Sequence, residues 1–586
     1  MGSGKHSFID DPAELGALLA VARGEVQADL VLRGGRLVNV FSGEIYPAEV
    51  AIYAGRIAGV SPTTGTYRGA DVLNLDGEYI TPGLIDAHMH IESSMLLPAE
   101  FANAVLPHGT TSVVTDPHEI ANVHGLEGIN FMLQASEGLP LRVFVMLSPC
   151  VPATDMETAG ARLSADDLST LLDHQRVLGI AEMMNYPGVA GGSADMVEKL
   201  MLGHRAGMRI DGHAPLVRGL TLQAYVAAGV SSDHESVTEE EALEKLRAGC
   251  QLLIREGSTA RNLDALLPLV NARTSRFCSW ATDDKQPEDL RREGHIDHNI
   301  RRAVSRGLDP VLALQMGTIN TARHYGLNDL GAIAPGYRAD LLTISDLSSM
   351  HVTRTFAAGK LVAEGGRMLE PCVHRVELPR NTMAVPSLRF DHFRIKSEGK
   401  QARVIRLLSE QIVTRSLVMS PLVAEGYVQA DTSKDILKIA VIERHGRGGH
   451  TGLGLVNGFH LQGGALASSV AHDSHNLVVV GASDEDMAVA ANAVVAMGGG
   501  LAAACDGQVH AQLALPVAGL MSDRPLEEVR AGMEDLLRAA RSLGCTLSNP
   551  YMAMAFLALP VIPELKLTDM GLVDVVAFQL CSLFVS

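Results

Sequence analysis

Two kinds of hydrophobic patterning alternate along the chain. From about residue 29 to residue 80, short apolar runs are separated by turn-forming residues, as in DLVLRGGRLVNV and AEVAIYAGRIAGV, which predicts a small β-rich unit. From residue 82 to about residue 334, each short apolar run is followed by a longer stretch with helical spacing, which is the pattern of repeated βα units. Beyond residue 335 the strand-and-turn pattern returns, for example in GAIAPGYRADLLTIS.

The βα region contains eight candidate strands, at 83–88, 111–116, 142–147, 178–183, 208–213, 229–234, 251–256 and 277–283. Eight such units match a (β/α)8 TIM barrel in number and in total length. We therefore predict an α/β fold with the barrel at residues 82–334. Residues 1–81 and 335–382, on its two flanks, together form a composite small β-sandwich domain, and residues 383–586 form a C-terminal α/β domain.

Composition and charge narrow the class of protein. Hydrophobic residues make up 47% and charged residues 20% of the chain, which is a globular composition. No apolar run reaches the roughly 18 residues that a membrane span needs, and the N-terminus has no pattern of a secretion signal. We predict a soluble, cytoplasmic protein without a membrane partner. The net charge of −19 disfavours nucleic acid as a partner. Seven scattered cysteines without a CxxC pair predict reduced thiols.

Six potential metal ligands lie at or just beyond the ends of five of the candidate strands. They are His88, His90, Glu182, His213, His234 and Asp283. The carboxyl ends of the strands form the open, active face of a (β/α)8 barrel, so these side chains are expected to meet there. Residues two apart on a strand share a face, and His88 and His90 can therefore bind one ion together.

The combination of these residues indicates a metal site. A single histidine at a strand end is more often a hydrogen-bonded structural residue, but four histidines and two carboxylates would leave costly unpaired groups without metal. Six ligands exceed the four of a tetrahedral zinc ion, so two ions that share a carboxylate fit better. The ligand set would accept Mn²⁺, Fe²⁺ or Zn²⁺. Two ions would acidify a water for hydrolysis, and Asp283 could carry its proton to the leaving group.

Several motifs carry a resemblance to a known family. PGLIDAHMH, the later single histidines and the final TD resemble the amidohydrolase superfamily. HMHIESS, TDPHEIANVHG, AEMMNYPGV, DGHAP, SSDHES, ATDDK and SVAHDSHN, which span most of the chain, resemble the bacterial adenine deaminases. The resemblance implies hydrolysis of adenine to hypoxanthine and ammonia in purine salvage. It also implies two iron or manganese ions, rather than zinc. We further expect a homo-oligomer, a dimer.

The resemblance also implies a role for each predicted ligand. His88 and His90 would bind one metal, His213 and His234 would bind the other, Glu182 would bridge them, and Asp283 would be both ligand and proton shuttle. Many amidohydrolases have a carboxylated lysine at the position of Glu182. The glutamate in AEMMN argues against a dihydropyrimidinase-like or urease-like enzyme.

The sequence does not identify the residue that protonates the purine ring. Related deaminases of nucleosides and of cytosine carry a glutamate shortly after the strand-five histidine, whereas HAPLVRG contains no acid. The acids closest to the expected open face are Glu92, Glu119 and Glu235. Glu92 is the first choice as a catalytic residue, with a role in fixing its loop as the alternative. Asp284 either contacts a ring nitrogen, as in purine deaminases, or is solvated.

Three further polar clusters allow two interpretations each. Asp116, His118 and Glu119 contact the substrate or an accessory ion, or they belong to a turn at Pro117.

Arg255 and Glu256 orient the base, or they form an ion pair at the barrel rim. The run His472, Asp473, His475 and Asn476 covers the mouth of the active site, or it is a turn that satisfies its own backbone.

The sequence also allows two alternatives to adenine deamination. The first is an amidohydrolase that acts on another aminated heterocycle or on a cyclic amide, because the barrel and the metals are common to the superfamily. The second is a scaffold protein that has kept the fold and lost the metal. A scaffold would be expected to lack ligands, and all six are present in this chain.

Overall fold

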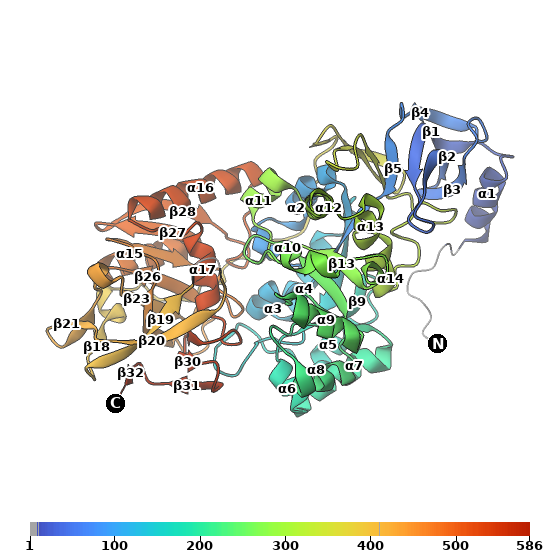
Figure 1. Ribbon diagram of the computed structural model, residues 1–586. Helices are drawn as coiled ribbons and strands as arrows, with labels where there is room; N and C mark the ends of the chain where they lie inside the picture. The colour runs from blue at the N-terminus through green and yellow to red at the C-terminus, as the bar shows by residue number, and fades with distance from the viewer. Residues whose placement is uncertain (1–8, 10, 409–410, 586) are drawn as a thin grey trace.

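The protein is arranged as three bodies in a row. The computed structural model describes residues 9, 11–408 and 411–585. A sheet near the N-terminus lies at one end, a barrel lies in the middle, and a second large sheet with its helices lies at the other end (Figure 1).

The middle body is the predicted (β/α)8 barrel. Its strands are β6 (Leu84–Met89), β7 (Thr110–Thr115), β8 (Arg142–Leu147), β9 (Val177–Met183), β10 (Arg209–Gly212), β11 (Ser232–Asp233), β12 (Gln251–Arg255) and β13 (Cys278–Ala281). All eight candidate strands are confirmed. Strands β6 to β10 and β11 to β13 form two parallel sheets. Backbone hydrogen bonds close both seams, from Ser231 N–H to the Ile210 carbonyl at 2.9 Å and from Asp283 N–H to the His88 carbonyl at 3.0 Å.

Helices surround this barrel. They are α2 (Pro98–Val105), α3 (His118–His124), α4 (Leu126–Ala135), α5 (Ala165–Ser169), α6 (Tyr186–Ala190), α7 (Ala194–Ala206), α8 (Gly219–Ala227), α9 (Glu239–Ala248), α10 (Leu263–Leu266), α11 (Pro287–Glu293), α12 (Ile296–Ser305), α13 (Pro310–Met316) and α14 (Ile319–Tyr325). Side chains such as Ile85, Phe144 and Leu253, from separate strands, fill one buried cluster inside the barrel. On the outer side, Trp280 is fully buried and donates its indole N–H to the Ala313 carbonyl at 2.8 Å.

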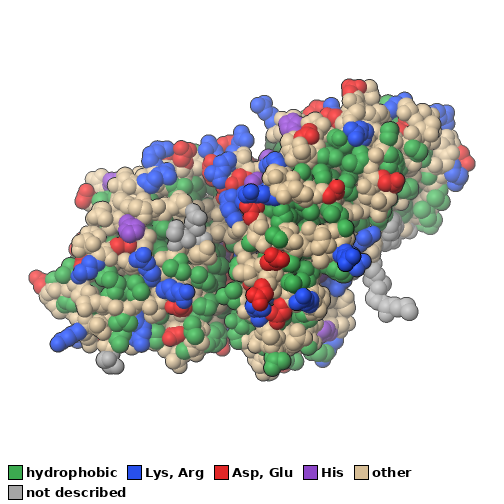
Figure 2. Space-filling model, in the orientation of Figure 1, with side chains coloured by type: hydrophobic (Ala, Val, Ile, Leu, Met, Phe, Trp, Pro, Cys, Tyr) green, Lys and Arg blue, Asp and Glu red, His purple; other side chains and the backbone are tan. Residues whose placement is uncertain are grey.

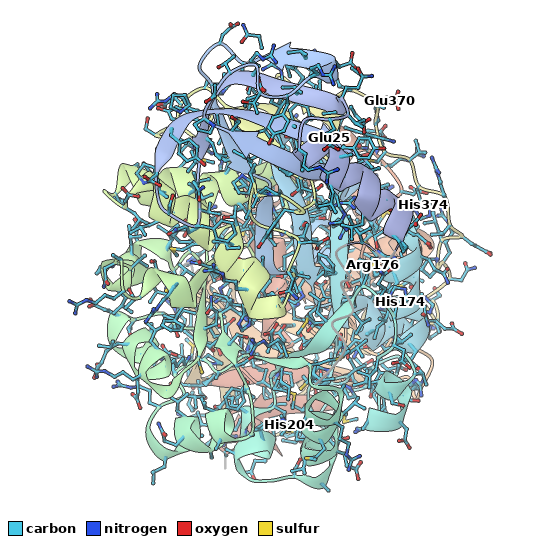
Figure 3. The ribbon with its side chains drawn as sticks, turned by 90° about the vertical axis from the view of Figure 1, so that its right-hand side faces the viewer. Glu25, His174, Arg176, His204, Glu370 and His374 are labelled. Carbon is cyan, nitrogen blue, oxygen red and sulfur yellow. The ribbon has the colours of Figure 1, made fainter. Side chains whose placement is uncertain are left out.

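The first body is built from both flanks of the barrel. Helix α1 (Pro12–Ala22) packs beside a nine-stranded sheet. Its strands are β1 (Ala28–Val38), β2 (Ile45–Tyr53), β3 (Arg56–Ser61), β4 (Gly69–Asn74), β5 (Tyr79–Pro82), β14 (Leu341–Ile344), β15 (Val352–Ala357), β16 (Lys360–Glu364) and β17 (Arg367–Met368). β14 pairs with β5, and Leu32, Val50, Leu341 and Phe356 share one core. Figure 3 shows this sheet lying across one end of the barrel.

The third body contains a second nine-stranded sheet, with smaller sheets at its edges. Its strands are β19 (Gln401–Leu407), β20 (Thr414–Met419), β23 (Leu437–Ile442), β24 (Thr451–Asn457), β25 (Ala465–Ser468), β26 (Leu477–Gly481), β27 (Gly500–Cys505), β28 (Gln508–Ala514) and β32 (Phe584–Val585). The smaller sheets contain β18 (Ile395–Lys396), β21 (Leu422–Ala424), β22 (Tyr427–Gln429), β29 (Leu565–Thr568), β30 (Gly571–Asp574) and β31 (Gln579–Cys581).

Helices cover both faces of the large sheet of the third body. Ala440 and Ile442 of β23 pack with α15 (Asp484–Ala496), whereas Ile439 and Val441 share a cluster with α16 (Leu526–Ser542) and α17 (Pro550–Leu557). Successive side chains of a strand point to opposite faces, so an all-apolar strand requires cover on both sides. This explains the continuous hydrophobic runs of the region, and the predicted C-terminal α/β fold is confirmed.

The barrel and the third body share one hydrophobic core. Phe101 and Val105 of α2 belong to the same buried cluster as Val529 and Met533 of α16. Charged side chains gather at the outer seam, where α11 and α16 approach each other (Figures 1 and 2). An ion pair joins Arg291 to Glu527 there at 2.9 Å. Exposed pairs contribute little to stability, so apolar contacts hold the two bodies together. Within the described ranges, no helix has both the length and the apolar character of a membrane span.

The burial of Trp280 generates a stability prediction. Trp280→Ala leaves a cavity and removes the hydrogen bond to Ala313, and we expect the free energy of unfolding to fall by about 3–5 kcal/mol. Urea unfolding followed by far-UV circular dichroism measures the change. The matched control is Phe277→Ala, since Phe277 is 48% exposed and its loss should cost about 0.5 kcal/mol or less. Equal losses in the two variants would contradict the prediction.

Candidate metal centre

The six potential ligands converge at one end of the barrel, and each is at most 7% exposed. Glu182, at the end of β9, lies between two pairs of histidines. Its Oε1 is 3.9 Å from His88 Nε2 and 3.4 Å from His90 Nε2. Its Oε2 is 2.7 Å from His213 Nδ1 and 3.2 Å from His234 Nε2. One oxygen therefore faces each histidine pair, which is the arrangement that a bridging carboxylate requires.

Asp283 completes the set from the loop after β13. Its Oδ1 is 3.6 Å from His88 Nε2 and 3.1 Å from His90 Nε2. Its Oδ2 accepts a hydrogen bond from Arg255 Nη1 at 2.6 Å. Burial raises the pKa of Asp283, but the charge of Arg255 outweighs this effect and holds the pKa well below its ordinary value. Asp283 is thus an ionised carboxylate.

The ligand atoms fit divalent metal ions. His90 Nδ1 lies 2.8 Å from the Asp116 carbonyl, which can only accept, so Nδ1 carries the proton and Nε2 presents its lone pair to Asp283 and Glu182. His88 Nε2, which faces Glu182 and Asp283, is buried without a hydrogen-bond partner in the described chain. Three sets of ligand atoms lie within 4.8 Å of one another: His88, His90 and Glu182; Glu182, His213 and His234; and His88, His234 and Asp283.

The buried carboxylates of the site also favour the binding of positive charge. Burial lowers the pKa of His213, but Glu235 and Glu182 outweigh it and raise this pKa to about 9. For Glu182, burial opposes ionisation, yet His213 and His234 hold its pKa well below the ordinary value. The carboxylates would therefore bind a cation here in place of protons.

Arg255 and Glu235 form a buried ion pair beside the metal ligands. Arg255 Nη2 donates to Glu235 Oε2 at 3.1 Å, and Glu235 Oε1 lies 3.5 Å from His234 Nε2. The predicted ion pair of Arg255 and Glu256 at the barrel rim is therefore wrong, because Arg255 pairs with Glu235 and Asp283 inside the site. Glu256 points elsewhere, with Oε1 3.5 Å from Arg302 Nε.

Ser93 connects Asp284 to Glu119. Its Oγ is 2.6 Å from Glu119 Oε1 and 2.5 Å from Asp284 Oδ1. A hydroxyl has one proton and can donate to only one of these oxygens, so the other carboxyl must donate to it. Burial raises the pKa of Glu119, which favours its protonated form. Asp284, Ser93 and Glu119 thus share an extra proton, and Asp284 lines the pocket over the metal ligands.

Glu92 lies behind this trio. Its Oε1 accepts the Ile120 N–H at 3.3 Å, and it is not among the residues that line the pocket. Burial, followed by repulsion from Glu119, raises the pKa of Glu92 to about 8. The structure therefore brings Glu92 next to the proton-sharing carboxyl groups rather than to the pocket itself.

Asp116 and His118 lie on the same side of the site as His90. Asp116 Oδ2 is 3.3 Å from His118 Nδ1, and the Ser148 hydroxyl donates to Asp116 Oδ1. His118 lines the pocket and places Nδ1 3.4 Å from Glu182 Oε1. The structure thus places His118 in the site, and Asp116 pairs with His118 and Ser148 rather than fixing a turn at Pro117.

The third body closes the pocket over the ligands. Ile412, Phe556, Leu559 and Ile562 form an apolar wall opposite the strand ends. His472 stacks on Phe556, with ring centroids 4.7 Å apart, and Asp473 lies beside it in the pocket lining. The sequence does not reveal the apolar wall, because its residues have the same pattern as a buried core. His472 and Asp473, by contrast, stand out in the sequence as a polar run between apolar segments.

The four histidines at the strand ends, His88, His90, His213 and His234, differ in position from other histidines of the chain. His174, His204 and His374, labelled in Figure 3, lie on the outside of the fold. His204, for example, is exposed and pairs through Nε2 with the Ala228 carbonyl at 2.9 Å.

Lys566 supports the apolar wall from behind and generates a prediction. Its buried Nζ donates to the carbonyls of Ile412 and Phe556, both at 2.9 Å. Burial lowers the pKa of Lys566 to about 7. An unfolded lysine titrates near pH 10.4, so between about pH 7 and about pH 10 only the unfolded chain holds this proton. Stability contributed by Lys566 therefore rises with pH in this window.

We expect the unfolding free energy of the wild type, relative to Lys566→Met, to increase from about pH 7.5 to about pH 9. Urea unfolding of both proteins at several pH values measures the difference. The exposed Lys400→Met serves as control and should run parallel to the wild type. A parallel curve for Lys566→Met would disprove the effect.

Comparison with known proteins places these features in a family. Residues 79–362 match the amidohydrolase family, and residues 411–579 match the adenine deaminase C-terminal domain. The adenine deaminase of Desulfatibacillum aliphaticivorans is 48% identical over 568 residues, which cover 97% of this chain and 99% of that protein. Adenine deaminase 2 of Carboxydothermus hydrogenoformans is 50% identical over 566 residues, 96% of this chain and 98% of that protein. The adenine deaminase of Kosmotoga olearia is 46% identical over 573 residues, which cover 97% of this chain and 98% of that protein. The chain therefore belongs to the adenine deaminase family of amidohydrolases.

Proposed function

We propose that this protein hydrolyses adenine to hypoxanthine and ammonia. The observation that carries the proposal is the placement of Glu182 between two buried histidine pairs, in a pocket whose far wall comes from residues within the matched adenine deaminase C-terminal domain. The purine would lie between the strand ends and the wall formed by Ile412, Phe556, Leu559 and Ile562.

For the metal centre we propose the assignment made from the sequence. His88 and His90 hold one ion, His213 and His234 hold the other, Glu182 bridges them, and Asp283 is a further ligand. This mixture of imidazole and carboxylate groups would accept Mn²⁺, Fe²⁺ or Zn²⁺, and the resemblance to the bacterial adenine deaminases favours manganese or iron over zinc. When bound, the ions would lower the pKa of a water molecule and so supply the nucleophile for C6 of adenine.

Asp283 carries the proton that this reaction releases. The Arg255 ion pair keeps the Asp283 carboxylate ionised and ready to accept a proton from the attacking water. As the new C–O bond forms and the C–N bond breaks, Asp283 passes this proton to the departing amino group, which leaves as ammonia. The other proton of the water leaves the new C6 oxygen as the carbonyl forms, and it replaces the proton that the enzyme gives to the purine ring.

A second proton is needed at the purine ring. The proton shared by Asp284, Ser93 and Glu119 lies at the pocket wall, and we assign its delivery to a ring nitrogen to Asp284. Glu92, with its pKa of about 8, would resupply Glu119. Asp116, His118 and Glu235 hold the surrounding groups and limit the orientations that adenine can take.

The dimer and the cytoplasmic location stay predictions.

A substrate panel tests the proposed function. The protein is purified from cells supplied with Mn²⁺ or Fe²⁺, and ammonia release is followed from adenine, adenosine, guanine and cytosine. We expect turnover of adenine above all others. Turnover of a different heterocycle, without adenine, would favour the rival amidohydrolase, and bound metal without any turnover would reject the deaminase.

Glu182→Gln tests the bridging role. The substitution keeps the side-chain volume but removes the negative charge, so we expect loss of at least one metal equivalent and a fall in kcat of about 100-fold or more. Metal content and ammonia release are measured on the same preparation. Glu198→Gln, on the exposed face of α7, should change neither quantity. Retention of both metal and activity in Glu182→Gln would show that Glu182 is not the bridge.

Asp283→Asn tests the proton shuttle. An amide cannot accept the proton of the attacking water, and we expect kcat to fall by about 10²–10⁴-fold with a smaller change in KM. The control is Asp535→Asn on the exposed face of α16, which should behave as the wild type. Asp283 is also a proposed ligand, so metal content is determined in parallel. A fall in kcat that only mirrors lost metal would refute the shuttle role.

A further inference from the structure

A second group of potential ligands lies outside the six strand-end residues. His118 comes from the barrel, at the start of α3, and His472 and Asp473 come from the loop between β25 and β26 of the third body. Their ligand atoms lie within 4.8 Å of one another. The three side chains are buried, with 4%, 4% and 2% exposed. The two bodies therefore contribute jointly to one buried cluster.

We propose that His118, His472 and Asp473 bind a third divalent transition-metal ion, which joins the C-terminal body to the barrel. This site goes beyond the proposed reaction and shares no ligand with the metal pair.

The tautomer of His118 supplies the first argument. Its Nδ1 lies 3.3 Å from Asp116 Oδ2 and 3.4 Å from Glu182 Oε1, so Nδ1 carries a proton. Nε2 faces Asp473 Oδ1 at 3.6 Å, which is longer than a direct hydrogen bond. Once Nε2 gives up its proton, a metal cation between the two atoms would take the place of that proton.

The surroundings of His118 support the same conclusion. Histidines that bind metals usually donate their other ring N–H to a carboxylate, which fixes the tautomer and the ring orientation. Asp116 has this role toward His118, and the Ser148 hydroxyl in turn orients Asp116. His118 is thus held as metal-binding histidines are held.

Distances and unpaired atoms provide the second argument. Asp473 Oδ1 is 3.6 Å from His118 Nε2 and 3.7 Å from His472 Nδ1. Two ligands of one tetrahedral ion are about 3.4 Å apart, given bonds of about 2.1 Å. In the described chain, Asp473 Oδ2 and His472 Nε2 are buried without hydrogen-bond partners. A buried carboxylate oxygen without a partner is costly, and a bound cation would satisfy it.

The loop that carries two of the ligands is positioned independently of them. Buried Arg444 donates from Nε to the His475 carbonyl and from Nη2 to the Ala518 carbonyl at 2.9 Å. Asn476 Nδ2 donates to the Thr158 carbonyl of the barrel at 2.9 Å. The geometry of the site is therefore preformed, which lowers the cost of binding an ion.

His475 is excluded as a ligand, although it lies near Glu119. Its Nδ1 accepts the Ala471 N–H at 3.1 Å, so the proton of the neutral ring is on Nε2, which faces Glu119 Oε2 at 3.7 Å. An N–H cannot bind a metal. Three protein ligands remain, and because all three line the pocket, a fourth position is open to water or to the substrate.

The ligand set indicates the class of ion. Two imidazoles and one carboxylate suit Mn²⁺, Fe²⁺ or Zn²⁺, and they are too few oxygen ligands for Ca²⁺ or Mg²⁺.

Metal stoichiometry tests the proposal on the full-length protein. After growth with Mn²⁺ and dialysis against metal-free buffer, manganese, iron and zinc per chain are measured by mass spectrometry. We expect about three equivalents in the wild type and about one fewer in both Asp473→Asn and His472→Gln. The exposed His450→Ala, in the same body, is the matched control and should keep the wild-type content.

Glu182→Gln separates this site from the metal pair. It should lose metal at the pair and retain the third ion, so failure of one assignment does not entail failure of the other. Anomalous X-ray diffraction at the manganese edge gives a second readout that needs no variant, with a peak expected between His118 Nε2 and Asp473 Oδ1. Unchanged metal content in Asp473→Asn and His472→Gln, or the absence of this peak in crystals with an occupied metal pair, would overturn the proposal.

Discussion

Closure of the barrel between its last and first strands is the constraint on which the site depends. The hydrogen bond from Asp283 N–H to the His88 carbonyl, 3.0 Å long, joins residues that are almost two hundred positions apart in the chain. It brings the Asp283 carboxylate to His88 and His90 at the end of β6, while Glu182 reaches the same point from β9. Without this seam the carboxylates would not face the histidines, and no common cation site would exist.

Concentrated negative charge is the second feature of this site. Several carboxylates are buried around the histidines, and Arg255 is the guanidinium that pairs with two of them, Glu235 and Asp283. Burying charge is costly unless it is paired, so the protein gains stability when cations occupy the site. Metal binding and folding of the open end of the barrel are therefore expected to support each other.

The third body contributes directly to the lining of the pocket over the strand ends. Its apolar wall, supported by Lys566, excludes water from the pocket, and its polar loop places His472 and Asp473 opposite His118. Exclusion of water strengthens the electrostatic interactions of the site, because the local dielectric falls. The same contacts make the pocket depend on how this body packs against α2 and α3.

The amino-acid sequence by itself determined the eight strands, the family and the six polar side chains that converge at the strand ends, because strand periodicity and the position of polar groups at strand ends are local properties. The boundaries of the three bodies stay predictions. Only the tertiary structure decided that Arg255 pairs inside the site, that Ser93 links Glu119 to Asp284, and that Phe556 lies over the ligands. These contacts join residues distant in the chain, and their side chains have the same local pattern as ordinary ion pairs, turns and core. Nothing in a linear pattern distinguishes them until folding brings the partners together.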